Sequence, residues 1–153
     1  MTLRIVRQIV HELTRVFMWV YVKPRYHYRK TSDSDKIPKP PYLIISNHGT
    51  FFDPWIIGVH SLSPFAYMCN DDAFRAPPLV KWYLGVIGAF PKKKGTQDYK
   101  AMKETLRRLK ARMPVCIFPE GQTTWDGRTQ LIYRGLEKVV KRANVPLVMY
   151  RLR

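Results

Sequence analysis

The chain of 153 residues is 46% hydrophobic and 25% charged, a composition typical of one folded domain rather than of a disordered chain. It has two cysteines, each within an apolar run, and no apolar stretch of the roughly 18 to 20 residues that a membrane-spanning helix needs, which argues against a disulfide-bonded scaffold and a membrane span. Its 27 Lys and Arg against 11 Asp and Glu give a formal net charge of +16, which favours partners that carry phosphate, such as nucleic acid, anionic lipid or a phosphorylated small molecule.

Residues 1–30 are predicted to form an amphipathic helical segment that associates with a membrane. Apolar side chains recur there at helical spacing, with charged side chains between them: Ile5, Ile9, Leu13, Val16, Phe17 and Val20. Trp19 and Tyr21 are residue types that favour a bilayer interface, and a basic stretch follows them. The alternative is a helix that packs its apolar face on the domain core and leaves its basic face solvated. The sequence leaves both possibilities open.

Residues 31–41 are polar and rich in proline, which predicts a linker. From residue 42 onward, helix-like stretches alternate with short β-prone runs at 42–46, 65–69, 89–91, 115–118 and 147–150. The clearest predicted helix covers 97–112, with Thr96 as N-cap and one apolar face made of Met102, Leu106, Leu109 and Met113. Residues 42–153 are therefore expected to form an α/β domain in which a mixed sheet is flanked by helices.

A histidine and an aspartate follow the first predicted strand. His48 and Asp53 lie in the segment SNHGTFFDP, at the C-terminal end of a strand, where open α/β sheets bind ligands. An imidazole can accept a proton at neutral pH, and a carboxylate five residues later can hold its other ring nitrogen. The pair is a candidate catalytic dyad. The alternatives are a partly buried structural histidine and an aspartate that only caps the next helix.

A second polar turn, Phe118-Pro119-Glu120-Gly121, follows the fourth predicted strand. A Glu beside a Gly can accept hydrogen bonds from a hydroxylated ligand while backbone amides bind an oxyanion. Taken alone, this tetrapeptide is only a turn. Taken with Asn47-His48-x4-Asp53 earlier in the chain, it resembles two signature blocks of the glycerolipid acyltransferase family, which includes the 1-acyl-sn-glycerol-3-phosphate acyltransferases.

Two further segments resemble this family more loosely. In GAFPKKK (88–94), Lys94 stands where the family has a phosphate-binding Arg, and Val145-Pro146-Leu147-Val148 resembles the start of the family's last block. The resemblance covers about residues 42–150. The amphipathic N-terminus looks like the membrane-docking helices that precede the domain in similar enzymes.

The resemblance implies an O-acyltransferase that moves a fatty acyl group from acyl-CoA or acyl carrier protein to a lysophospholipid hydroxyl. The expected acceptor is 1-acyl-sn-glycerol-3-phosphate, and the product is phosphatidic acid. His48 is implied as the general base and Asp53 as the residue that orients it, and the implied substrate-binding residues are Asn47, Lys94, Glu120 and Gly121. No bound cofactor is implied. The expected partners are an anionic membrane surface, the lysophospholipid and the acyl donor, and the expected location is peripheral, on the cytoplasmic face of a membrane.

The chain departs from the family pattern at three places. The family often continues FPEG with Thr-Arg-Ser, whereas this chain has Gln122, Thr123 and Thr124, so the acceptor is less defined than the reaction. Lys94 keeps the charge of Arg but loses its bidentate fork. Met149 replaces the second proline of the last block, and similar enzymes continue with more sheet and helix. The chain is therefore expected to be a C-terminally truncated fragment.

Other functions remain open on the sequence. One alternative is an acyltransferase for a different lysolipid or alcohol. Another is a basic, non-enzymatic protein that binds lipid or nucleic acid, which the charge and the interspersed aromatic residues support, although no nucleic-acid-binding motif is visible. The histidines and cysteines show no paired ligand spacing, so no metal site is predicted.

Overall fold

The computed structural model describes residues 2–25, 37–61, 63–93, 98–124, 132 and 135–152. Its helices are α1 (Thr2–Arg25), α2 (Asp53–His60), α3 (Pro78–Ile87), α4 (Tyr99–Lys110) and α5 (Leu136–Ala143), with a 3-10 helix η1 (Asp71–Arg75). Its strands are β1 (Leu43–Ser46), β2 (Ala66–Asn70), β3 (Ala89–Lys92), β4 (Val115–Ile117) and β5 (Leu147–Tyr150). Each predicted strand is present, within one or two residues of its expected bounds.

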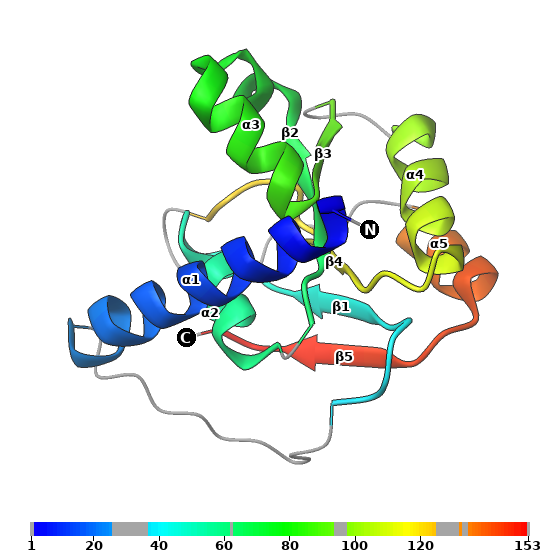
Figure 1. Ribbon diagram of the computed structural model, residues 1–153. Helices are drawn as coiled ribbons and strands as arrows, with labels where there is room; N and C mark the ends of the chain where they lie inside the picture. The colour runs from blue at the N-terminus through cyan, green and yellow to red at the C-terminus, as the bar shows by residue number, and fades with distance from the viewer. Residues whose placement is uncertain are drawn as a thin grey trace.

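The strands form one sheet in the order β3-β2-β4-β1-β5 (Figure 1). The predicted α/β fold with flanking helices is confirmed. All strand pairs among the described residues are parallel rather than mixed. Helical segments return the chain between successive strands, and such crossovers are what parallel neighbours require.

The hydrophobic core has one layer on each face of the sheet, because successive strand residues point to opposite faces. On one face, α2 and α3 contribute Ile57 and Leu84 to a cluster with Ile44, Cys116 and Phe118. On the other face, α4 and α5 cover a second cluster that includes Leu43, Ala101, Leu109, Val115 and Val139. In Figure 1, α4 and α5 accordingly lie together, apart from α1, α2 and α3.

Helix α4 begins at Tyr99, two residues later than expected. Asp98, not Thr96, caps it, because the Asp98 carboxylate accepts hydrogen bonds from the backbone amides of Lys100 and Ala101. Thr96 itself lies outside the described residues, as does most of the predicted linker 31–41. At the end of that linker, Ile37 packs against the first core cluster.

Helix α1 packs on α2 and α3 through its polar side, and its apolar side faces away from the domain. Arg7, His11, Thr14 and Met18, which are spaced to share one face, are partly or fully buried. The outer stripe of α1 is exposed throughout: Ile5, Ile9, Leu13, Val16, Phe17 and Val20. The alternative of an apolar face packed on the core is therefore wrong. No described helix has the length and apolar content needed to cross a membrane.

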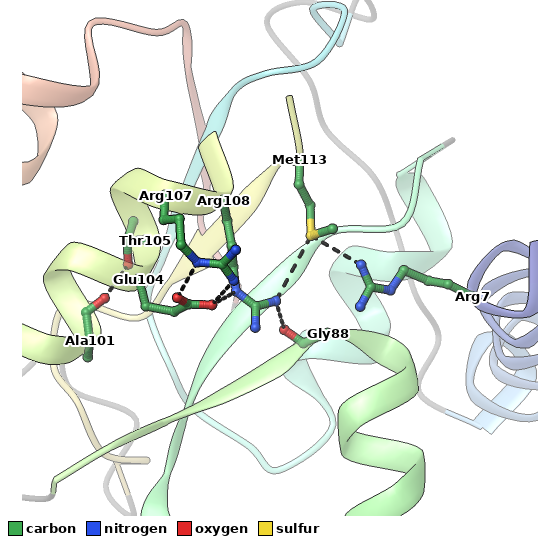
Figure 2. Close-up of polar contacts among 8 residues, drawn as sticks. All are labelled: Arg7, Gly88, Ala101, Glu104, Thr105, Arg107, Arg108 and Met113. Atoms are coloured by element: carbon green, nitrogen blue, oxygen red, sulfur yellow. Dashed lines mark hydrogen bonds and ion pairs between the residues drawn. The ribbon is translucent and has the colours of Figure 1, made fainter. Parts of the chain in front are cut away.

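Hydrogen bonds, rather than apolar burial alone, attach α1 to the domain. The Arg7 Nε donates to the carbonyl oxygen of Val86 at 2.8 Å, near the C-terminus of α3, where the helix dipole favours a cation. Figure 2 shows Arg7 and Arg108 both directed at the sulfur of Met113, at 3.4 Å and 4.0 Å. Arg108 also donates to the carbonyl oxygen of Gly88 at 2.8 Å. These contacts fix one end of α1 beside the end of α3.

Substitution of Ile57 tests the packing of α2. Because Ile57 is completely buried, Ile57→Ala should lower the free energy of unfolding by about 2 to 5 kcal/mol, measured by urea unfolding followed by circular dichroism. The matched control is Ile9→Ala on the exposed stripe of α1, which should change that free energy by less than about 0.5 kcal/mol. Equal losses in the two variants would contradict the outward orientation of this stripe.

Candidate active site

The candidate site lies where two neighbouring strands send the chain to opposite faces of the sheet. Strand β1 leads into α2 on one face, whereas its neighbour β4 leads toward α5 on the other. Open α/β sheets form a crevice at such a point, beyond the C-terminal ends of the strands. His48 follows β1 and Glu120 follows β4, so the fold brings the two predicted motifs to this edge of the sheet.

The side chain of Asp53 holds the loop that carries His48. Its Oδ2 lies 2.9 Å from the His48 Nδ1 and accepts hydrogen bonds from the backbone amides of Gly49 at 2.7 Å and Thr50 at 2.9 Å. Its Oδ1 accepts a hydrogen bond from the Thr50 hydroxyl at 2.6 Å. Asp53 is the first residue of α2, and Phe52 occupies the N-cap position. The Asp53 side chain therefore does not act as an N-cap. The carboxylate turns back to the loop instead, so the cap-only alternative is wrong.

The hydrogen bonds to Asp53 keep its carboxyl group ionised despite burial. Asp53 is only 2% exposed, and burial by itself raises the pKa of a carboxyl group. Hydrogen bonds from His48 and Thr50 outweigh that effect, and the pKa of Asp53 lies below its ordinary value of 3.8. The site therefore holds a negative charge beside the imidazole at neutral pH.

Three contacts orient the imidazole of His48. The Asp53 carboxylate forms a hydrogen bond with Nδ1. The ring of Phe118 stacks on the imidazole, with centroids 4.1 Å apart and planes 22° apart. The backbone amide of Thr124 donates a hydrogen bond to the His48 carbonyl oxygen at 2.9 Å. With Nδ1 held by the carboxylate, Nε2 is the ring nitrogen left to meet a ligand. Phe118 of the second motif and Thr124, three residues after that motif, thus position the histidine of the first.

Glu120 is a buried carboxyl group that lacks a hydrogen-bond partner among the described residues. It is 3% exposed, and both of its oxygens are buried. Buried polar groups are nearly always hydrogen-bonded, so Glu120 is a carboxyl group whose expected donors are not supplied by the described residues. Gly121 adopts a positive φ of 67° and donates its amide to the carbonyl oxygen of Phe118 at 3.0 Å. That amide closes the turn that presents Glu120.

Asn47, another predicted substrate-binding residue, makes its side-chain contacts elsewhere. The Asn47 side chain forms two hydrogen bonds with the backbone of Leu152: Nδ2 donates to its carbonyl at 2.8 Å, and Oδ1 accepts from its amide at 2.7 Å. Asn47 therefore fastens the chain beyond β5 to the end of β1. Lys94 lies outside the described residues. Lys92, two residues earlier, is partly buried at the C-terminal end of β3, on the same edge of the sheet as His48.

The two cysteines do not provide a nucleophile at this edge. Burial raises the pKa of both the Cys69 and the Cys116 thiols above the ordinary value, which disfavours the reactive thiolate. In the part of the chain that the structure describes, no three His, Cys, Asp or Glu side chains gather as they would around a metal ion.

Thr50 was not predicted as a site residue, although the sequence contains a signal for it. Thr50-Phe51-Phe52-Asp53 has the Thr-x-x-acid spacing of a capping box, which pairs a hydroxyl and a carboxylate around a helix start. The Phe118 stacking and the Thr124 contact have no comparable signal, because they depend on the pairing of β1 with β4.

Comparisons with known proteins show a family and a similar fold. Residues 28–151 match the model of the family described as Acyltransferase. The chain is also similar to the crystal structure of the 1-acyl-sn-glycerophosphate (LPA) acyltransferase, PlsC, from Thermotoga maritima, with a TM-score of 0.61 and 17% sequence identity over 94% of this chain and 73% of that chain. At this identity the likeness shows a shared fold. No curated protein matches the chain.

The lowered pKa of Asp53 predicts how stability depends on pH. A carboxyl group whose pKa is lower in the folded state stabilises the protein above its unfolded pKa, and this contribution is lost as the pH falls through the folded value. Asp53→Asn should therefore lower the free energy of unfolding near pH 7, and the difference from wild type should shrink below about pH 4. Urea unfolding across this range measures it.

The control for this experiment is Asp72→Asn, because Asp72 is exposed and its pairing with Arg75 is solvated. This variant should show little change at either pH. A difference between wild type and Asp53→Asn that is independent of pH would contradict the ionised, hydrogen-bonded carboxylate described above.

Proposed function

The chain belongs to the acyltransferase family, as its sequence motifs predicted, and we propose that it transfers a fatty acyl group from an acyl thioester to the hydroxyl of a lysophospholipid. The observation that carries this proposal is the contact between His48 Nδ1 and Asp53 Oδ2, made at the C-terminal edge of the sheet with Nε2 left for a substrate. We propose 1-acyl-sn-glycerol-3-phosphate as the acceptor and phosphatidic acid as the product. PlsC from Thermotoga maritima, which has a similar fold, is an LPA acyltransferase.

The proposed chemistry needs one general base and no covalent enzyme intermediate. The His48 Nε2 accepts the proton of the acceptor hydroxyl as its oxygen attacks the thioester carbonyl. Collapse of the tetrahedral intermediate breaks the carbon–sulfur bond, and the imidazolium returns the proton to the leaving thiolate of coenzyme A or acyl carrier protein. Asp53 at Nδ1 stabilises the imidazolium formed between these steps. No bound cofactor takes part in this scheme.

Glu120 is the proposed contact for the acceptor's polar head. Its two buried oxygens lack partners among the described residues, and a glycerol hydroxyl would supply the missing donor. For the phosphate, we propose Lys94, assisted by basic neighbours such as Lys92 at the same edge of the sheet. A lysine provides charge without the bidentate geometry of arginine. Asn47 and Gly121 would act here by holding the ends of β5 and β4.

Membrane association is proposed through the outer stripe of α1. The stripe is apolar and exposed, and the exposed Arg4 and Arg25 lie on the same helix. A helix with these two properties binds in the interface of an anionic bilayer without crossing it. On this proposal, the enzyme acts as a peripheral protein at the cytoplasmic face of a membrane, where its lipid acceptor resides.

Replacement of His48 tests the proposed reaction. Purified protein is mixed with acyl-CoA and lysophosphatidic acid in vesicles, and free thiol is followed with a chromogenic reagent. His48→Ala should lower the turnover at least about a hundredfold, because general base catalysis contributes roughly 10² to 10⁴ in rate. Circular dichroism should show an unchanged fold. His60→Ala, at the far end of α2, is the matched control and should retain turnover.

A His48→Ala variant with more than about a tenth of wild-type turnover would contradict the general-base role. If wild type releases no thiol with any lysolipid but binds vesicles, the chain is a lipid-binding protein without this activity. Retention on DNA that falls with salt, in the absence of thiol release, would favour the nucleic-acid-binding alternative.

Replacement of Lys94 tests the acceptor. If Lys94 binds the phosphate, Lys94→Ala should raise the KM for lysophosphatidic acid roughly tenfold to a hundredfold, the effect of a lost charge-assisted contact, and leave the KM for acyl-CoA nearly unchanged. Lys110→Ala, at the far end of α4, is the matched control. Equal effects on lysophosphatidic acid and on a monoacylglycerol, which has no phosphate, would assign the phosphate contact elsewhere.

A further inference from the structure

An aromatic cluster projects from the loop that holds the dyad. Phe51 and Phe52 lie between His48 and Asp53, and Trp55 lies in the first turn of α2. The ring centroids of Phe51 and Trp55 are 4.9 Å apart, and those of Phe52 lie 5.9 Å from each of the other two. Phe51 is 72% exposed and Phe52 is 42% exposed. Packing among the three rings thus holds two apolar side chains in a fixed position outside the domain.

Hydrogen bonds through Tyr83 connect this cluster to α1. The indole N–H of Trp55 donates to the Tyr83 hydroxyl at 2.9 Å, and the same hydroxyl oxygen lies 3.3 Å from the Thr14 hydroxyl. Tyr83 belongs to α3, so its hydroxyl connects α1, α2 and α3. A small cavity of about 40 Å³ between these helices is lined by Trp55, Tyr83 and His11, among others. The loop that holds the dyad therefore keeps a defined position relative to α1.

Ile132, Leu147 and Met149 are exposed elsewhere, but most of the exposed large apolar side chains of the described residues lie on this helical layer. They include the outer stripe of α1, the aromatic cluster, and Leu79, Val80 and Trp82 of α3. The opposite layer, α4 and α5, exposes mainly Lys, Arg and Glu, with Tyr99 as its one exposed large apolar residue among those described. Basic side chains accompany the apolar ones on the first layer, where Arg4, Arg25 and Lys81 are exposed. A large exposed apolar area next to positive charge is typical of a surface that binds anionic lipid.

We propose that Phe51 and Phe52 insert into the interface of an anionic phospholipid bilayer, as a second contact beside α1. Phe side chains on a membrane-facing surface bury at the boundary between the headgroups and the acyl chains. Because the two residues lie between His48 and Asp53, their insertion holds the dyad at the lipid surface, where an acceptor hydroxyl can reach Nε2 without leaving the bilayer. This inference rests on the proposed lipid acyl transfer, and it adds a docking contact that belongs to the catalytic loop itself.

Vesicle binding of the full chain tests this contact. Protein is sedimented with phosphatidylcholine vesicles that contain or lack phosphatidylglycerol, without acyl donor or lysolipid. The double variant Phe51→Ser/Phe52→Ser should reduce partitioning onto the anionic vesicles about tenfold to a hundredfold, as expected for two aromatic side chains removed from the interface. The matched control is Tyr99→Ser, because Tyr99 is 66% exposed on the opposite layer. Its partitioning should stay within about twofold of wild type.

A second variant separates docking from a structural role of the loop. Phe51→Trp keeps an interfacial aromatic side chain and should bind vesicles as wild type does. Circular dichroism and thermal unfolding without lipid should be the same for all variants used. Unchanged partitioning of the folded double variant, or equal losses in the double variant and Tyr99→Ser, would overturn the proposal.

Two further outcomes keep this inference distinct from the proposed reaction. His48→Ala should bind vesicles as wild type does, so a protein that fails to transfer acyl groups can still support the docking contact. If light scattering without lipid shows a dimer that the double variant converts to monomer, the cluster is an interface between two copies of the chain. That result would also overturn the proposal.

Discussion

The solvation of one buried anion, the carboxylate of Asp53, determines the geometry of the site. Burying a charge is costly unless hydrogen bonds compensate it, and here the donors are the His48 ring, the amides of Gly49 and Thr50, and the Thr50 hydroxyl. All of them come from the few residues before α2, so the loop must close on the carboxylate while it is ionised. That closure sets the direction of the imidazole at the end of β1.

Two carboxyl groups at adjacent strand ends have opposite environments. Asp53 accepts several hydrogen bonds from its own loop, whereas Glu120, after β4, has none from the described residues. The first is therefore suited to hold a charge and a neighbouring side chain in place. The second lacks, among the described residues, the hydrogen-bond donors that a buried carboxyl group requires. The parallel pairing of β1 and β4 places both at one edge of the sheet.

Much of the fold and part of the site could be predicted from the sequence. The strands were found because each is a short apolar run, and His48 and Asp53 because their spacing combines with a second motif. Periodicity shows which residues of α1 share a face, but only tertiary contacts decide that the face of Arg7 meets the domain. Likewise, Asn47 binds Leu152, and Phe118 stacks on His48, only because parallel strands bring distant segments together.

The way in which α1 is attached explains its exposed apolar stripe. A helix held by apolar burial hides that stripe, whereas α1 is held by directional contacts such as Arg7 to the Val86 carbonyl and Thr14 to the Tyr83 hydroxyl. Apolar area left in water costs about 25 cal/mol per Å², so the exposed stripe is unfavourable unless lipid covers it. The Tyr83 hydroxyl also accepts a hydrogen bond from the Trp55 indole, in the first turn of α2. The hydroxyl that contacts α1 therefore also helps to position the helix that follows the His48 loop. On the membrane proposal, this hydroxyl fixes the position of the dyad relative to the bilayer.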